Sequence, residues 1–396
     1  MPAGGLELVQ ALEGHEGCGA SEMLSSPARC VSKRTAPSAH RPASTLFAVW
    51  AVAWSPDGSQ LASCGADKTV RVWSFNAQFG RWACAAVLEK CHARTVRAVS
   101  WTRDGRRLLS GSFDATVAVW EQSGDVWEQV GLLEGHENEV KGVACNPRND
   151  LVATCSRDKS GERRVTMRIH ILNRAVTDYE HAAASPRAVW VWEDAGGGEY
   201  EAVDVKQGAH AQDVKCVKWH PGGEILASCS YDDTASLWRE AGPDRWERMQ
   251  ELSQASGGHA STVWMVSFRP DGSEMATCSE AGDVKVWRPD GAGVWRHAAT
   301  LQGYFGGPVY AVDMDEKGRI AACSRDNSVK VFGRNGDWDG DSGGGGYEVL
   351  ATVPEAHPPG DVNCVQWRPG GDGVLATCGD DGTVRLWRLG VDVDMI

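Results

Sequence analysis

Short runs of alternating apolar and polar residues recur along the whole chain. Val70–Trp73 and Val284–Trp287 alternate with period two and are rich in β-branched residues, which is typical of half-buried β-strands. Turn sequences such as Ser55–Gly58 and Arg269–Gly272 follow similar runs. These turns predict hairpins, because proline and glycine supply the backbone angles that tight turns need. The pattern therefore predicts an all-β fold.

The runs belong to one larger repeat. Each copy reads Gly-His, an apolar alternating run, a Pro-x-Gly type of turn, Leu-Ala-Ser/Thr-Cys, Asp-x-Thr/Ser and an apolar pair with a closing aromatic. The closing aromatics are Trp73, Trp120, Trp192, Trp238, Trp287, Phe332 and Trp387. Most of their spacings lie near the roughly 40–45 residues of one four-stranded blade. Residues 1–396 are thus predicted to form a single seven-bladed WD40 β-propeller.

The two chain ends are predicted to close the ring. The last repeat stops just after Trp387, one strand short of a blade, and residues 6–12 form an unassigned strand-like segment. We expect residues 6–12 to supply the outer strand of the seventh blade, because pairing the ends removes an open seam.

Ser, His and Asp recur in each well-formed repeat, but a hydrolase needs such a triad only once, in a pocket. In a propeller blade the Trp indole can donate to a Ser/Thr hydroxyl, which bonds His, which bonds Asp. No catalytic residues are expected. The predicted structural sets are His92/Ser110/Asp114/Trp120, His136/Thr154/Asp158/Trp192, His210/Ser228/Asp232/Trp238 and His357/Thr377/Asp381/Trp387.

Two blades, five and six, depart from this pattern, and blade one takes its His from far upstream. Blade one offers Ser63, Asp67 and Trp73, with His15 far upstream. Blade five has His259, Thr277 and Trp287 but Ala281 at the Asp position. Blade six keeps only Asp326, with Tyr304 or Phe305 for His, Ala322 for Ser/Thr and Phe332 for Trp, and is predicted to be the least rigid.

Two stretches lack the repeat: residues 161–188, within blade three, and residues 19–48, before the first strand of blade one. Removing residues 161–188 would restore an ordinary spacing between Trp120 and Trp192. Both stretches open with Gly and end in Ala before Val, codons that can carry splice-site sequences. They are interpreted as retained introns or, alternatively, as two long surface loops. Sequencing the transcript would distinguish the two.

The net charge and the distribution of apolar residues limit the classes of function and the compartment that we expect. With 40 Lys and Arg against 53 Asp and Glu, the net charge of −13 argues against broad binding of nucleic acid. No run of 18 apolar residues occurs, so no membrane span is expected, and the acidic N-terminus does not resemble a targeting signal. The cytoplasm is the expected compartment, with the nucleus as a second.

The 13 cysteines include no CxxC pair. Six of them occupy one repeat position, which favours packing in the core over a metal or cofactor site. These are Cys64, Cys155, Cys229, Cys278, Cys323 and Cys378.

One face is predicted to carry a binding surface. The residue before each turn Asp and the residue after the first Val of each inner strand should point out around the mouth of the central channel. We call these positions the axial surface. They include Trp50, Arg97, Phe113, Lys141, Arg157, Lys215, Tyr231, Trp264, Tyr310, Arg325 and Asn363.

Aromatic residues and cations gather at these positions although the chain is acidic, and such residues anchor protein interfaces. We predict partner binding by Arg97, Lys141, Arg157, Lys215, Tyr231, Trp264 and Arg325. The alternative interpretation is a scatter of solvated side chains.

Four runs carry a closer resemblance. They are LEGHENEVKGVACNP (Leu133–Pro147), ATCSRDKS (Ala153–Ser160), QDVKCVKWHPGGEILASCSYDDT (Gln212–Thr234) and DVNCVQWRP (Asp361–Pro369). These runs resemble the WD40 subunit of the cytosolic iron–sulfur protein assembly machinery, and the resemblance covers every blade.

The resemblance implies a scaffold of the cytosolic iron–sulfur targeting complex that holds no cluster itself. It implies as partners a small metal–sulfur-cluster-domain protein of the mitotic-spindle-associated type, a HEAT-repeat protein and apo iron–sulfur clients. It also implies a functional role for Arg157. Some clients of that family end in a C-terminal peptide with a terminal aromatic. Some members carry Leu-Tyr-Arg, linked to cochaperone recruitment, where this chain has Leu237-Trp238-Arg239. The alternative function is a WD40 adaptor of another complex, such as a ubiquitin-ligase substrate receptor.

Overall fold

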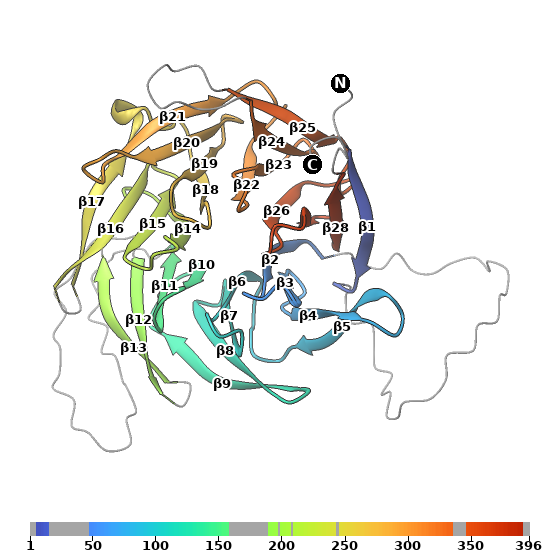
Figure 1. The fold of residues 1–396 in the computed structure, drawn as a ribbon. Helices are drawn as coiled ribbons and strands as arrows, with labels where there is room; N and C mark the ends of the chain where they lie inside the picture. The colour runs from blue at the N-terminus through green and yellow to red at the C-terminus, as the bar shows by residue number, and fades with distance from the viewer. Residues whose placement is uncertain are drawn as a thin grey trace.

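The computed structural model describes residues 5–15, 47–157, 189–196, 199–206, 209–242, 245–335 and 346–390. They form seven four-stranded antiparallel sheets set as blades around one axis (Figure 1). The predicted seven-bladed propeller is confirmed. Of the two predicted insertions, residues 161–188 lie outside the described residues, and so do residues 19–48 except Phe47 and Ala48.

The first three blades follow one another in sequence, each starting at the axis and stepping outward (Figure 1). Blade one consists of β2 (Val49–Trp54), β3 (Gln60–Gly65), β4 (Val70–Asn76) and β5 (Arg81–Leu88). Blade two consists of β6 (Val96–Trp101), β7 (Arg107–Ser112), β8 (Thr116–Ser123) and β9 (Val126–Glu134). Blade three consists of β10 (Val140–Cys145), β11 (Leu151–Ser156), β12 (Val189–Gly196) and β13 (Glu199–Lys206).

The next three blades repeat this order. Blade four consists of β14 (Val214–Trp219), β15 (Ile225–Ser230), β16 (Ala235–Gly242) and β17 (Arg245–Leu252), followed by the 3-10 helix η1 (Gln254–Ser256). Blade five consists of β18 (Val263–Phe268), β19 (Met275–Ser279), β20 (Val284–Pro289) and β21 (Trp295–Leu301). Blade six consists of β22 (Val309–Met314), β23 (Ile320–Ser324), β24 (Val329–Arg334) and β25 (Tyr347–Val353). No helix in the described parts of the chain is long and apolar enough to cross a membrane.

Blade seven joins the two ends of the chain. It consists of β26 (Val362–Trp367), β27 (Val374–Gly379), β28 (Thr383–Leu389) and, as its outer strand, β1 (Leu6–Glu13). Leu6 pairs with Leu389 and Leu12 with Val384. The predicted closure by residues 6–12 is therefore confirmed, and the sheet edge that a missing outer strand would expose is covered.

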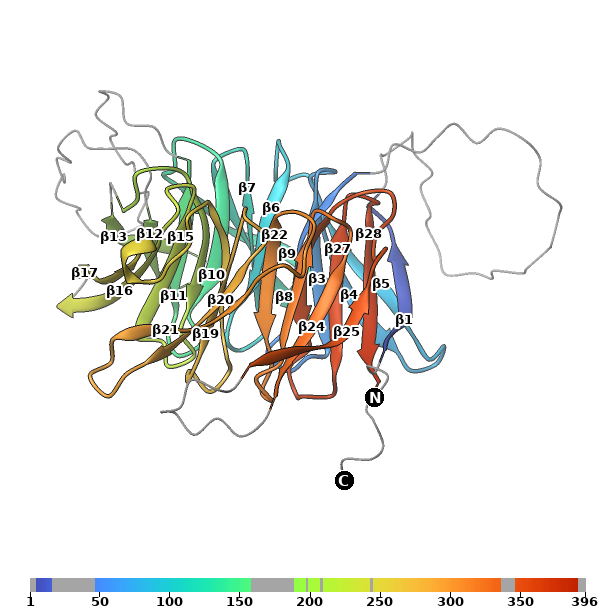
Figure 2. The same cartoon turned by 90° about the horizontal axis from the view of Figure 1, so that it is seen from above.

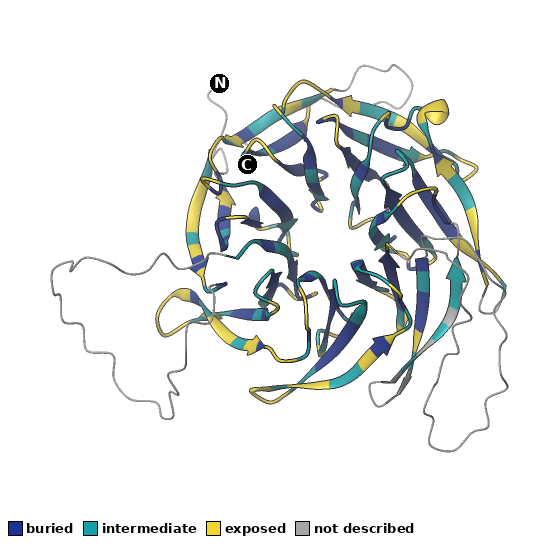
Figure 3. Ribbon diagram, turned by 180° about the vertical axis from the view of Figure 1, so that it is seen from behind, coloured by how far each residue is buried: buried dark blue, intermediate teal, exposed yellow. Residues whose placement is uncertain are grey.

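The core lies between the blades, which stand side by side in Figure 2. Leu12, Trp54 and Trp73 of blades seven and one, for example, belong to one buried cluster. Buried residues gather on the inner strands, whereas exposed residues mark the outer strands and the loops (Figure 3). Because each blade packs on two neighbours, the ring holds the loops at its two faces in fixed positions.

Candidate functional site

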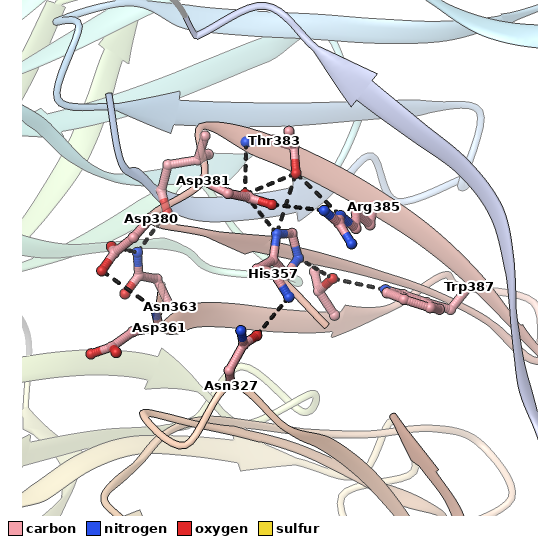
Figure 4. A network of polar contacts seen from close by, with 11 residues as sticks. Asn327, His357, Asp361, Asn363, Asp380, Asp381, Thr383, Arg385 and Trp387 are labelled. Atoms are coloured by element: carbon pink, nitrogen blue, oxygen red, sulfur yellow. Dashed lines mark hydrogen bonds and ion pairs between the residues drawn. The ribbon is translucent and has the colours of Figure 1, made fainter. Parts of the chain in front are cut away.

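A chain of hydrogen bonds links the side chains of the predicted set in blade seven (Figure 4). Nδ1 of His357 lies 2.8 Å from Oδ1 of Asp381, and Nε2 lies 2.7 Å from Oγ1 of Thr377. The indole of Trp387 donates to the same hydroxyl at 2.8 Å. The chain thus runs from the core of the blade to the turn between β27 and β28.

Blades two and four repeat this geometry. Nε2 of His92 lies 2.9 Å from the Ser110 hydroxyl, and Nδ1 lies 3.1 Å from Asp114. The His210 ring bonds Ser228 at 2.7 Å and Asp232 at 3.0 Å. In both blades the closing Trp, Trp120 or Trp238, donates to the hydroxyl at 2.9 Å. Trp238 of the Leu237-Trp238-Arg239 run is therefore engaged inside blade four.

Blade three contains the same core contacts. Thr154 lies 2.8 Å from Nε2 of His136 and accepts from the Trp192 indole at 2.9 Å. Asp158, the fourth residue predicted for this set, lies outside the described residues.

Blades one and five complete the chain in ways that depart from the ordinary spacing, blade one with the predicted but distant His15 and blade five with Asp283, which the repeat pattern did not supply. In blade one the distant His15 lies 2.8 Å from the Ser63 hydroxyl and 2.9 Å from Asp67. In blade five His259 bonds Asp283 at 3.0 Å, so the carboxylate comes from two residues after Ala281. The sequence pattern missed this substitution because it fixed the Asp to a single repeat position.

Blade six replaces hydrogen bonds with aromatic packing. Phe332 is fully buried, and its ring centroid lies 5.1 Å from that of Tyr304 and 6.2 Å from that of Phe305. Asp326 accepts from the amide of Gly306 at 2.7 Å instead of from a histidine. The lower rigidity expected for this blade stays a prediction.

These sets resemble a hydrolase triad only in composition. The hydroxyls of Ser63, Ser110 and Thr377 belong to fully buried residues, and each accepts a tryptophan N–H. Burial lowers the pKa of His357 despite its bond to Asp381. Burial acts to raise the pKa of Asp381, but the hydrogen bond and charge of His357 hold it below its ordinary value. A substrate cannot reach these hydroxyls, so the chains act as supports for the turns.

These turns fix the position of part of the axial surface. The amide of Phe113 donates to the Thr95 carbonyl at 2.9 Å, and the amide of Tyr231 donates to the Asp213 carbonyl at 3.0 Å. Arg157 and Arg325 make the same backbone bond, to Glu139 at 3.2 Å and Pro308 at 3.0 Å. The residue before each of these turns is therefore held beside the start of its own inner strand.

The side chains of the axial surface contact one another from blade to blade. The Arg97 guanidinium lies 5.2 Å from the centroid of the Trp50 ring, across the junction of blades one and two. Lys141 Nζ lies 5.0 Å from the Phe113 ring. Such cation–π contacts contribute about 0.5–1 kcal/mol each at exposed sites. These contacts hold the cationic group and the aromatic ring of each pair in defined positions.

The aromatic part of the axial surface continues over blades four to six. Lys215 Nζ lies 3.4 Å from the Tyr231 ring centroid and 4.9 Å from that of Trp264. Trp264 packs edge-on against Tyr231 at 5.5 Å and against Tyr310 at 5.1 Å. The structure thus joins these predicted residues into one continuous row.

Three cations share this region. Burial, together with the charges of Lys141 and Arg97, lowers the pKa of Lys215 to about 7. Lys141 also bonds Glu139 at 3.1 Å, and Arg157 lies 3.4 Å from Asp213. Because the positive charges of Arg97, Lys141 and Lys215 repel one another, a bound carboxylate or other anion is favourable beside them.

The residues predicted for the axial surface did not include its acidic side chains. Glu280 accepts from the Trp264 indole at 2.8 Å, and Asp380 accepts from Asn363 at 2.9 Å. Burial and the charge of Asp380 raise the pKa of Asp361. Glu280 and Asp380 occupy the same repeat position as Phe113 and Tyr231, so the repeat alignment itself could have found them. The axial surface is cationic on blades two to four and acidic on blades five and seven.

Comparison with known proteins agrees with this geometry. The WD domain, G-beta repeat (WD40) family matches residues 35–74, 82–121, 127–160, 204–239, 250–288, 295–333 and 348–388. A Chlamydomonas reinhardtii protein, named probable cytosolic iron-sulfur protein assembly protein CIAO1 homolog, is 43% identical over 86% of this chain and 95% of its own length. The chain belongs to the WD40 family of cytosolic iron–sulfur protein assembly proteins.

Two further relatives match a smaller part of this chain. A Neurospora crassa protein, named probable cytosolic iron-sulfur protein assembly protein 1, is 28% identical over 66% of this chain and 68% of its own length. A Caenorhabditis elegans protein named as a CIAO1 homolog is 36% identical over 28% of this chain and 34% of its own length.

The repeated cysteines of this WD40 protein lie in its core. All six thiols expected to pack there belong to residues with no exposed surface. Burial raises the pKa of these thiols, as at Cys155 and Cys229, which keeps them protonated. Within the described residues, no three His, Cys, Asp or Glu side chains are grouped so that they could hold a metal ion.

Proposed function

We propose that this protein is a scaffold of a cytosolic complex that delivers iron–sulfur clusters to cytosolic and nuclear apoproteins. The observation that carries the proposal is the axial surface, in which three groups of cation–π and aromatic contacts lie between Trp50 and Tyr310. The names of its relatives, which refer to cytosolic iron–sulfur protein assembly, supply the process.

The axial surface suits recognition of protein segments. Its aromatic rings and cations are pre-positioned by the turns, so little side-chain freedom is lost on binding. The cluster of Arg97, Lys141 and Lys215 suits a carboxylate, and the row of Tyr231, Trp264 and Tyr310 suits an apolar or aromatic side chain. A client segment that carries both groups would engage both parts of the surface.

The proposed partners follow from the family resemblance. They are a small metal–sulfur-cluster-domain protein of the mitotic-spindle-associated type, a HEAT-repeat protein and apo iron–sulfur clients. In this arrangement the propeller binds and orients the other proteins, and the cluster travels on a partner. The protein works in the cytoplasm, and nuclear clients would extend its location to the nucleus.

The test is a binding measurement with purified proteins. The full chain and a form lacking residues 161–188 are titrated with the small metal–sulfur-cluster-domain protein of the same organism, and then with an apo client. We expect both partners to bind, and we expect Arg157→Glu to weaken client binding at least tenfold.

The matched control is Arg106→Glu, which reverses an exposed charge in the turn between β6 and β7, away from the axial surface. It should leave client binding within about twofold of the unchanged protein. Equal losses for both variants would exclude a specific role for Arg157. If neither form of the chain binds the small partner, the proposed place in iron–sulfur delivery is wrong.

A further inference from the structure

The rim of the propeller carries an apolar strip on one side. In the described part of the chain, eight large apolar side chains are exposed, and only Tyr304 lies away from this strip. The other seven lie on β1, on the β4–β5 hairpin and on β9. They are Leu8, Val9, Phe75, Phe79, Val87, Val126 and Leu132. Since β1, β5 and β9 follow one another along the rim (Figure 1), these side chains gather on blades seven, one and two.

One position of the outer strands shows the contrast between the two sides of the ring. Val87 of β5 pairs with Arg71, and the corresponding residue of β9 is Leu132, which pairs with Ala118. On blades four, five and six the same position holds Glu251, Thr300 and Thr352. Blades three and seven hold Val205 and Ala11 at this position, so it is polar on blades four to six and apolar on the other four blades.

The edge of β5 lacks the usual protection of an exposed strand. Edge strands are commonly guarded by charged side chains that discourage pairing with another chain. Outer strand β17 has four such charges within Arg245–Glu251, whereas β5 has only Arg81 at its start, as β21 has only Arg296 and β25 only Glu348. What distinguishes β5 from β21 and β25 is the exposed apolar residue Val87. β5 pairs only with β4, so the backbone groups on its other edge are open to a partner.

A side chain from β1 covers only the first part of this edge. The Gln10 amide donates to the Trp82 carbonyl at 2.8 Å and accepts from the Trp82 amide at 2.9 Å. Gln250 makes the same pair of bonds to Trp295 at the start of β21, so a side chain of the preceding blade covers the first residues of both strands. Residues 83–88 of β5 lie beyond this contact.

The charges around the strip indicate the chemistry of the partner. β1 carries exposed Glu7 and Glu13, and β9 carries exposed Glu128 and Glu134. Neither strand contains a lysine or arginine. The basic residue on these outer strands is Arg81 of β5, whose guanidinium lies 5.8 Å from the centroid of the Phe79 ring. An apolar strip with predominantly acidic flanks is complementary to a segment that combines apolar residues with Lys or Arg.

We propose that this strip is a docking surface for an extended segment of a partner protein, in which apolar residues alternate with Lys or Arg. The segment adds to β5 as a further strand of blade one. Backbone hydrogen bonds supply affinity, while the apolar strip and its acidic flanks select the side chains. The surface lies on the rim and is separate from the axial surface, so it can be occupied independently of the proposed clients.

The probe is a capped ten-residue peptide of alternating valine and lysine, titrated into the full chain and compared with an alternating valine and glutamate peptide. We expect the lysine peptide to bind at least tenfold more tightly. Hydrogen exchange should slow at the amides of residues 83–88 when it binds, because pairing engages the strand edge.

Two variants separate docking from general attraction to an acidic protein. Val87→Lys places a charge on the proposed edge and should weaken binding at least tenfold. Thr352→Lys adds the same charge at the matched position of blade six and should leave binding within about twofold. Equal effects of both variants, or unchanged exchange at residues 83–88, would overturn the proposal. So would a concentration-dependent dimer that Val87→Lys abolishes, because the occupant would then be a second copy of this chain.

Discussion

Nδ1 of His259 lies 3.0 Å from the carboxylate of Asp283, although Ala281 occupies the position where the other blades place their aspartate. Asp283 lies immediately before β20 and also accepts from the Ser279 hydroxyl. Blade five therefore keeps its hydrogen-bonded chain by moving the acceptor two residues along the turn.

Removal of this carboxylate should destabilise the protein. Asp283→Ala leaves the buried His259 without its acceptor, and an unsatisfied buried polar group costs about 1–3 kcal/mol. Urea denaturation measures the change in the free energy of unfolding. The double variant Ala281→Asp with Asp283→Ala restores the acceptor at the ordinary position and should recover most of the loss. A double variant no more stable than the single one would contradict this account.

Ring closure should depend on one side chain of β1. Leu12 is 3% exposed and packs in the cluster that joins blades seven and one. Leu12→Ala should lower the free energy of unfolding by about 2–5 kcal/mol, the usual range for a buried leucine. Leu8 lies on the same strand but is 50% exposed, so Leu8→Ala should cost less than about 0.5 kcal/mol. Equal losses in the two variants would show that β1 acts only through its backbone pairing.

Stability should fall in mildly acidic solution. Burial lowers the pKa of His15 and His357 below the ordinary 6.5, so each is neutral in the folded protein and protonation favours unfolding. Their contribution is complete above pH 6.5 and is lost as the pH falls through the folded-state pKa. Denaturation curves between pH 7 and pH 5 should show this decline.

The histidine variants identify the source of the decline. His15→Gln and His357→Gln should each lower stability at pH 7 yet reduce its slope between pH 7 and pH 5. A slope unchanged in both variants would assign the acid sensitivity to other groups. The paired carboxylates Asp67 and Asp381 titrate in a separate range, because their pKa values lie below the ordinary 3.8.

Lys215 should titrate near neutral pH. Burial and the charges of Lys141 and Arg97 lower its pKa to about 7. Carbon-13 NMR of reductively methylated protein can follow the amine directly. Lys141→Met removes one repelling charge and should raise the pKa of Lys215, whereas Lys90→Met, at a side chain 87% exposed, should leave it unchanged. A pKa near 10 for Lys215 in the unchanged protein would refute the electrostatic account of the axial surface.

The repeat made the fold predictable from local sequence. Alternating runs, turn residues and the seven closing aromatics specified strands, blade number and the ring, because each blade is one local unit of about the same length. The strand at residues 6–12 could be assigned because the last repeat lacked an outer strand. The sets built around His92 and His210 could be predicted for the same reason, since the hydroxyl stands 18 residues after His and the Trp 10 residues after the hydroxyl. In the His136 set Trp192 follows Thr154 by 38 residues, and in the last set Thr377 follows His357 by 20, so these two depended on the wider repeat pattern.

Contacts between distant residues needed the tertiary structure. His15 lies 48 residues from Ser63 and 52 from Asp67 in the sequence, and only the folded chain shows the bonds between them. Asp283 reaches His259 through the shape of one turn, which residue spacing alone does not fix.

The repeat was enough to assign residue types to the positions around the axis, because it places each position on one face of the ring. The contact of Lys215 with Tyr231 and Trp264 depends on how neighbouring blades pack. The exposed apolar residues of β1, the β4–β5 hairpin and β9 come to one side of the rim for the same reason, since they are far apart in the sequence. Both surfaces exist because the closed ring brings side chains from separate blades together in space.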